Sequence, residues 1–117
     1  MQRLEGEQTL MRIFIGESDR LQSKPLYKVL LELFREEGFA GATVLRGVAG
    51  FGANSVLHTD RLLCLSQDLP LVIEVVDSAE KIENIIPQLD DMLQGGMITL
   101  EKARVIFYNQ MTDSNKC

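Results

Sequence analysis

Apolar residues along this chain follow two spacings, one typical of strands and one typical of helices. The run from Leu10 to Gly16 is short, apolar and β-branched at two positions, which predicts a central strand. After Ser23, apolar residues recur at helical spacing and predict a helix that Gly38 ends. The stripe of this helix comprises Leu26, Val29, Leu30, Leu33 and Phe34, with Pro25 tolerated in the first turn.

Two further strands are expected in the middle of the chain. One begins near Ala42 and runs to about Ala49, and the other spans Leu69 to Val76, the most strand-like segment of the sequence. Between them, the polar and glycine-containing stretch 50–60 is unlike a paired strand, so we expect a mobile loop there.

A second helix and a last strand complete the pattern. Asp77 is expected to cap the helix, whose apolar stripe comprises Ile82, Ile85, Ile86, Leu89 and Leu93. Pro87 lies within this stripe and predicts a kink or a division into two pieces, because proline lacks a backbone donor. Gly95 and Gly96 end the helix, and Met97 to Tyr108 predicts the final strand.

This order of elements predicts a single α+β domain over residues 1–117, with a ferredoxin-like βαββαβ sandwich. We expect a four-stranded antiparallel sheet with two helices on one face, and frayed tails over residues 1–9 and 109–117. Apolar residues on both sides of the last two strands suggest that the other face packs against neighbours, which predicts a homo-oligomer.

Composition excludes several classes of protein. The chain is 45% hydrophobic and 25% charged, which is ordinary for a soluble globular domain, and no apolar run approaches the length of a membrane span. The polar start of the chain lacks a secretory signal, so we expect a cytoplasmic protein. A net charge of −5 with scattered lysines and arginines argues against nucleic-acid binding.

Candidate metal and redox residues are few. Cys64 lies in an apolar run, where we expect a buried thiol, and Cys117 is a tail residue. His58 is the single histidine, and an imidazole without clustered partners favours a structural hydrogen bond over a metal site. The sequence leaves the role of His58 open.

Glycines gather in one segment, since five of the nine lie between Gly38 and Gly52. A glycine in a strand marks a bulge, a positive φ or the close approach of another group, so a bound ligand is one interpretation. A bulged strand with tight subunit packing is the alternative.

The same segment resembles a known family. Gly41-Ala42-Thr43-Val44, then Gly50-Phe51-Gly52 and Ile73-Glu74-Val75-Val76, are similar to motifs of the nitrogen-regulatory PII signal transducers. The pattern from Gly41 to Gly52, with His58-Thr59 and Asp68-Leu69-Pro70, resembles still more closely a PII-like family of uncharacterised bacterial and archaeal proteins. The resemblance covers roughly Leu10 to Phe107.

This resemblance implies a PII-like homotrimer that binds an adenine nucleotide in clefts between subunits. Carried over position by position, the nucleotide-binding residues are Gly41, Ala42, Thr43, Gly50, Phe51, Gly52, Val75, Val76, Gly95 and Gly96. Glycine amides can approach phosphate oxygens closely, and the Thr43 hydroxyl suits a base or ribose edge. The chain after Gly96 lacks the Asp-Gly-Lys sequence of the signal transducers, which favours ADP or AMP over ATP. Arg46, Arg61 and Arg104 remain open as substitutes for the missing lysine.

The function expected from these residues is regulatory binding with no obligatory cofactor and no metal. Motifs for catalysis are absent, so we expect no enzyme. The loop after the second strand is expected to signal to a regulated protein, with a membrane transporter as one candidate partner and no insertion into the membrane. The alternative is a trimeric ion-responsive or structural protein similar to the divalent-cation-tolerance family, without a nucleotide site.

Overall fold

Four strands form one antiparallel sheet in the computed structural model, which describes residues 4–51 and 68–110. In chain order the strands of this sheet are β1 (Gly6–Gly16), β4 (Thr43–Arg46), β5 (Pro70–Asp77) and β6 (Met97–Val105). They lie in the order β4-β5-β1-β6, so β1 and β5 are central and β4 and β6 form opposite edges. With α1 (Leu26–Glu36) and α2 (Ala79–Met92), this is the expected ferredoxin-like βαββαβ architecture.

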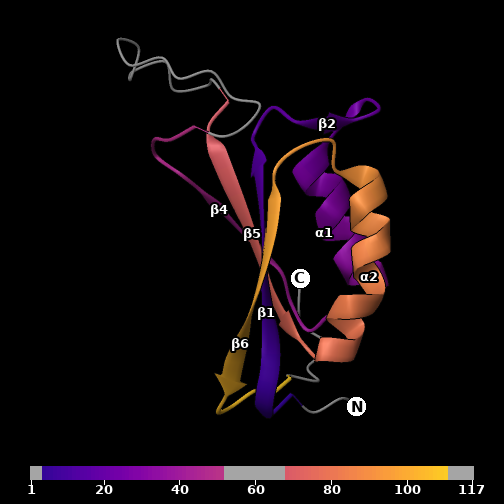
Figure 1. Cartoon of the computed structure of the whole chain (residues 1–117), viewed down its shortest axis with the longest axis vertical. Coiled ribbons are helices and arrows are strands. Elements are labelled where there is room, and N and C mark those ends of the chain that lie inside the picture. The colour runs from indigo at the N-terminus through magenta and orange to yellow at the C-terminus, as the bar shows by residue number, and fades with distance from the viewer. Residues whose placement is uncertain (1–3, 52–67, 111–117) are drawn as a thin grey trace.

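Both helices cover the same face of the sheet (Figure 1). The core lies between these layers, because alternate residues of the central strands point toward the helices. Its fully buried members include Met11, Ile13, Ile73, Leu30 and Phe34. The opposite face, here called the open face, carries the residues between them, and both helices leave it uncovered.

The sheet register fixes which residues share the open face. Arg12 of β1 pairs with Glu74 of β5 and Thr99 of β6, and Glu74 also pairs with Thr43 of β4. One polar row therefore crosses all four strands. The neighbouring row, two residues further along β1 toward its C-terminal end, is apolar and comprises Leu45, Val72, Phe14 and Met97.

Several boundaries differ from the sequence-based expectations. Residues 6–9, expected in a frayed tail, belong to β1 because their backbone pairs with β6 from Gly6 opposite Val105. The strand expected over 42–49 is only Thr43–Arg46, since Gly47 turns away after donating its amide to the Pro70 carbonyl at 2.7 Å. The last strand ends at Val105 instead of Tyr108.

The ends of both helices can be explained locally. Gly38 follows α1 with φ +77°, a conformation that glycine adopts readily, so the expected stop at Gly38 is confirmed. The expected cap of α2 is wrong by one residue, because the Ser78 hydroxyl accepts the amide of Lys81 at 3.2 Å. Asp77 ends β5 instead. Pro25 precedes α1 at its N-cap position instead of lying in the first turn.

Pro87 lies inside α2, which continues through it as one helix, so the expected division into two pieces does not occur. Pro87 is exposed, and water can serve the carbonyl that its missing amide would have bonded. A small hairpin of β2 (Arg20–Leu21) and β3 (Lys24–Pro25) precedes α1 and was not expected; its turn places Gln22 at φ +58°. Within the part of the chain described, no helix has the length and apolarity needed to cross a membrane.

Candidate functional site

The glycine-rich segment enters the sheet through a tightly held connection after α1. Asp77 is fully buried at the end of β5, and its carboxylate accepts the amides of Ala40 at 2.9 Å and Ser78 at 2.8 Å. The Lys81 ammonium donates to the Gly38 carbonyl at 2.6 Å and lies 5.5 Å from the centre of the Phe39 ring. These contacts fix the path of residues 38–40, and thereby the position of Gly41 at the start of β4.

A cavity of about 340 Å³ lies beside Gly41 and is here called the open-face cavity. Its walls come from the start of β4, the ends of β5 and β6, and three chain segments outside these strands: one before β1, one before β4 and one after β6. The lining residues are Leu4, Ala40, Gly41, Ala42, Thr43, Glu74, Val76, Val105, Phe107 and Tyr108. The structure thus brings together four of the expected site residues, Gly41, Ala42, Thr43 and Val76.

Glu74 is the charged residue of this cavity. Its Oε2 accepts from Nε of Arg12 at 2.9 Å, while Nη1 of Arg12 donates to Oε2 of Glu101 at 2.6 Å. The hydrogen bond to Glu74, and then that to Glu101, raise the pKa of Arg12 above its usual value. Arg12 therefore stays charged and holds Glu74 in place. Lysine and arginine side chains are absent from the cavity lining given above.

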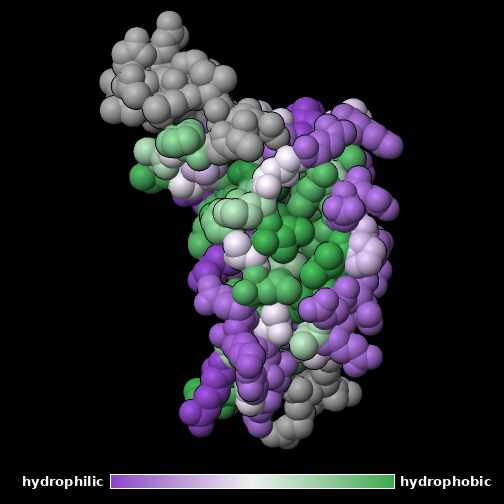
Figure 2. Space-filling view, viewed as in Figure 1, coloured by the Kyte–Doolittle hydropathy of each residue, from purple (hydrophilic) through white to green (hydrophobic). Residues whose placement is uncertain are grey.

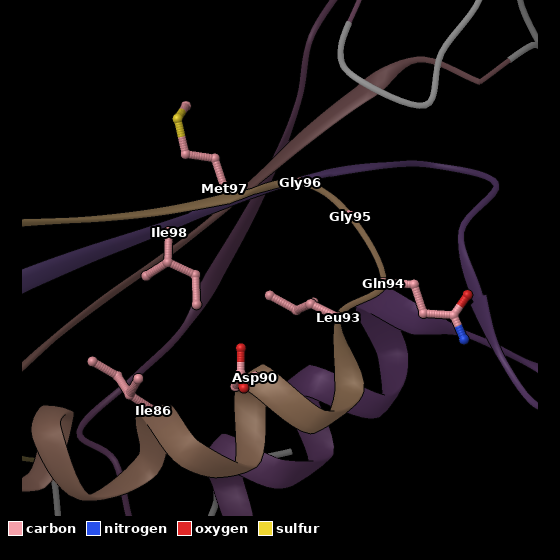
Figure 3. Close-up of a pocket in the computed structure, with 8 residues that line it drawn as sticks. All are labelled: Ile86, Asp90, Leu93, Gln94, Gly95, Gly96, Met97 and Ile98. Atoms are coloured by element: carbon pink, nitrogen blue, oxygen red, sulfur yellow. The ribbon is translucent and has the colours of Figure 1, made fainter.

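Gly95 and Gly96 lie in a different place. They line a groove of about 360 Å³ between the end of α2 and the start of β6, called the α2–β6 groove. Figure 2 shows an apolar patch between these two elements. In Figure 3, Ile86, Leu93 and Ile98 point toward one another inside the groove, Asp90 projects from α2 toward it, and Met97 points away.

Gly96 has a structural reason to be glycine. Its φ is +99°, and a Cβ at this position would clash with the backbone carbonyl oxygen of Phe14. Gly41 differs in both respects: its φ is outside the left-handed region, and a Cβ there would meet nothing within 4 Å. The sequence alone does not separate these two kinds of glycine.

The remaining expected residues are dispersed. Gly50 has φ +147° and lies against the Pro70 ring, and Phe51 is 69% exposed at the exit of β4. The Val75 side chain is buried in the core on the helix side, away from the open-face cavity. Gly52, like His58, Arg61 and Cys64, lies outside the described residues.

The cations considered as phosphate partners also occupy separate places. Arg46 pairs with Glu17 at 2.8 Å, and Arg104 is exposed on β6 opposite Glu7. Neither residue lines the open-face cavity. Over residues 4–51 and 68–110, no three His, Cys, Asp or Glu side chains are grouped so that they could hold a metal ion.

Glu74, Phe107 and Tyr108 line the cavity but were not among the expected site residues. Glu74 could have been selected from the sequence, because it is the charged member of an otherwise apolar strand before Asp77. Phe107 and Tyr108 gave no such signal, since they continue the apolar pattern of the last strand. They reach the cavity only because the chain leaves the sheet after Val105.

Sequence comparison identifies relatives over nearly the whole domain. The model of the family DUF190, described as "Uncharacterized ACR, COG1993", matches residues 8–105. A UPF0166 protein of Aquifex aeolicus (strain VF5) is 40% identical over 98 residues, which are 84% of this chain and 92% of that protein. A UPF0166 protein of Methanocaldococcus jannaschii is 32% identical over 97 residues, covering 82% and 89% of the two chains.

Solved structures share the fold at low sequence identity. A PII-like protein from Thermus thermophilus has a TM-score of 0.60 and 18% identity, with 88% of this chain and 94% of that chain covered. CPII from Thiomonas intermedia K12, solved with ADP, AMP and acetate, has a TM-score of 0.54 and 13% identity, with coverages of 86% and 89%. The chain therefore has a PII-like fold, and the match over residues 8–105 together with its UPF0166 relatives shows that it belongs to the DUF190 family.

Proposed function

We propose that this protein is a PII-like regulatory binding protein whose ligand is an adenine nucleotide. The observation that carries the proposal is the open-face cavity, because it joins Gly41, Ala42, Thr43 and Val76 in a space of about 340 Å³. That volume is at the small end of the range for ligand sites. CPII, which shares the fold, was solved with ADP and AMP, and this supports the choice of ligand class.

A complete site needs a second copy of the chain. Gly41 to Thr43 lie at the β4 edge, whereas Gly95 and Gly96 lie at the β6 edge, with β5 and β1 between them. Adjacent strands are about 4.8 Å apart, so the two edges are separated by roughly 14 Å across the sheet. Gly41 lies at the level of Leu10 and Gly96 at that of Ile15, about five residues apart along β1. A head-to-tail contact in which the β4 edge of one copy meets the β6 edge of the next, with the strands offset by that amount, would bring the two sets of glycines together. Contacts of this kind form a ring when the rotation between copies closes, and a rotation of about 120° gives the expected trimer.

The same strand connects the cavity to the loop expected to signal. Thr43 begins β4 and Arg46 ends it, after which Gly47 and Gly50 lie against Pro70 at the start of β5. A ligand beside Thr43 is thus one short strand away from the segment 50–60. We propose that this segment, most of which lies outside the described residues, carries the signal of ligand binding to a regulated protein such as a membrane transporter.

The role proposed is binding rather than catalysis. The cavity holds one carboxylate, from Glu74, and that carboxylate is already paired with Arg12. Its lining residues include neither a histidine nor a cysteine to act as nucleophile or general base.

Calorimetric titration with ADP, AMP and ATP, with and without magnesium, tests this function. The native protein is expected to bind at least one of these nucleotides with about one ligand per chain. Thr43→Val keeps the shape of the side chain and removes its hydroxyl, so we expect about tenfold weaker binding. Thr9→Val is the matched control, because Thr9 shares the helix side of β1 with Met11 and lines neither cavity, and its affinity should stay within about twofold of the native value.

Two outcomes would contradict the proposal. The first is the absence of saturable binding of all three nucleotides to the folded native protein. The second is an equal loss of affinity in the Thr43 and Thr9 variants, which would mean that the loss is not specific to the open-face cavity.

A further inference from the structure

The segment after β6 returns to the site instead of continuing the sheet. Val105 ends β6, and the next residues, Ile106 and Phe107, are 73% and 75% exposed. Phe107 and Tyr108 line the open-face cavity together with Gly41 and Thr43, whereas Ile106 does not.

The chemistry of the cavity suits an uncharged part of a ligand. Leu4, Val76 and Val105 supply apolar walls, and the polar groups are the Thr43 hydroxyl, the Glu74 carboxylate and the Tyr108 phenol. Cationic side chains do not line it, and the guanidinium next to Glu74, that of Arg12, is already bonded to Glu74 and Glu101, so the lining offers a phosphate no cationic partner. A flat heterocycle with polar edges fits this combination, whereas the phosphates of a nucleotide must point away from it.

We propose that Phe107 provides the surface on which the base of the ligand stacks, which makes Phe107 and Tyr108 part of the binding site. This inference rests on the proposed function and identifies the half of the nucleotide that the cavity holds. Any nucleobase can stack on an aromatic ring, because every base has a π-face.

Ligand choice depends on which half of the nucleotide the cavity holds. If it holds the nucleoside half, its contribution to binding is the same for adenosine, AMP and ADP, and differences among them arise from groups outside the cavity. Loss of the Phe107 ring should therefore weaken all three ligands by the same factor. Loss of a phosphate contact would instead affect the nucleotides and spare adenosine.

The test compares Phe107→Ala, Phe107→Trp and Ile106→Ala in calorimetric titrations with adenosine and ADP. Ile106→Ala is the matched control, since Ile106 is the adjacent residue, equally exposed, and absent from the cavity lining. We expect Phe107→Ala to weaken both ligands about 5- to 100-fold, with Phe107→Trp retaining affinity within a few-fold and Ile106→Ala unchanged. Circular dichroism checks that each variant is folded. We expect all three to fold, because the side chains that are replaced are exposed.

The outcomes separate this inference from the proposed function. If native protein binds ADP and Phe107→Ala binds it equally well, the stacking surface is overturned and the nucleotide function stands. An ADP-selective loss in Phe107→Ala, or an equal loss in Ile106→Ala, also overturns it. If the native protein binds neither adenosine nor ADP, the inference fails, and if AMP and ATP do not bind either, the proposed function fails with it.

Discussion

At the residue scale, some glycines of this chain are required by the backbone conformation and others are not. This difference decides how much stability each glycine loses when it is replaced by alanine. Gly96→Ala places a methyl group against the Phe14 carbonyl at a positive φ, so we expect the free energy of unfolding to fall by about 2 to 4 kcal/mol. Gly41→Ala meets open space and should change it by less than about 0.5 kcal/mol. Urea denaturation of the two variants measures the difference, and similar losses in both would contradict this account.

Gly41→Ala is also the sharper probe of binding. Because it leaves the fold intact, any loss of ADP affinity in this variant reports on the cavity itself. Gly50 is less suitable, because its φ of +147° and the Pro70 ring at 3.1 Å from an added Cβ make a substitution there strained.

At the element scale, α2 contains a proline that its tertiary contacts do not require. Pro87 is exposed, whereas Ile82, Ile85 and Leu89 of the same helix are buried against the sheet. Pro87→Ala restores a backbone donor within the helix, so we expect the free energy of unfolding to rise by about 1 to 3 kcal/mol, or the Tm by roughly 4 to 12 °C. Differential scanning calorimetry checks this, with Gln88→Ala as the exposed neighbouring control. A lower Tm for Pro87→Ala would mean that the helix is shaped around the proline.

At the scale of the whole molecule, the open face carries apolar residues at both edges of one row. Leu45 on β4 is 48% exposed and Met97 on β6 is 54% exposed, with Phe14 and Val72 between them. In a head-to-tail ring, Leu45 of one copy meets the β6 edge of the next, so Leu45→Glu should dissociate it. Sedimentation equilibrium is expected to give about three times the 13.1-kDa chain mass for the native protein and the chain mass for the variant.

Gln88→Glu is the control for this experiment, because it adds the same charge on the exposed side of α2 and should leave the mass unchanged. If the native protein sediments as a monomer, both the proposed ring and the proposed site between two copies are wrong. Unchanged assembly of Leu45→Glu would place the contact elsewhere on the surface.

Local patterns in the sequence determined the elements of this fold and their order. The spacing of Leu26, Leu30 and Phe34 predicts α1, the β-branched run before Asp77 predicts β5, and Gly38 predicts a helix end, because each depends on neighbours within a few residues. The pattern from Gly41 to Gly52, with His58-Thr59 and Asp68-Leu69-Pro70, similarly led to the PII-like family through short runs of adjacent residues. What the sequence left undetermined were the strand ends, such as the early start of β1 at Gly6.

Only the tertiary structure decided how the site is divided. It separates Gly41 and Thr43 from Gly95 and Gly96 by placing β4 and β6 at opposite edges of the sheet. It also brings Phe107 and Glu74, 33 positions apart in the printed sequence, to one cavity. These arrangements depend on strand pairing and on where the chain leaves the sheet, both of which are long-range effects. The sequence therefore supplied candidates such as Gly41 and Thr43, and the fold determined which residues lie together at one cavity.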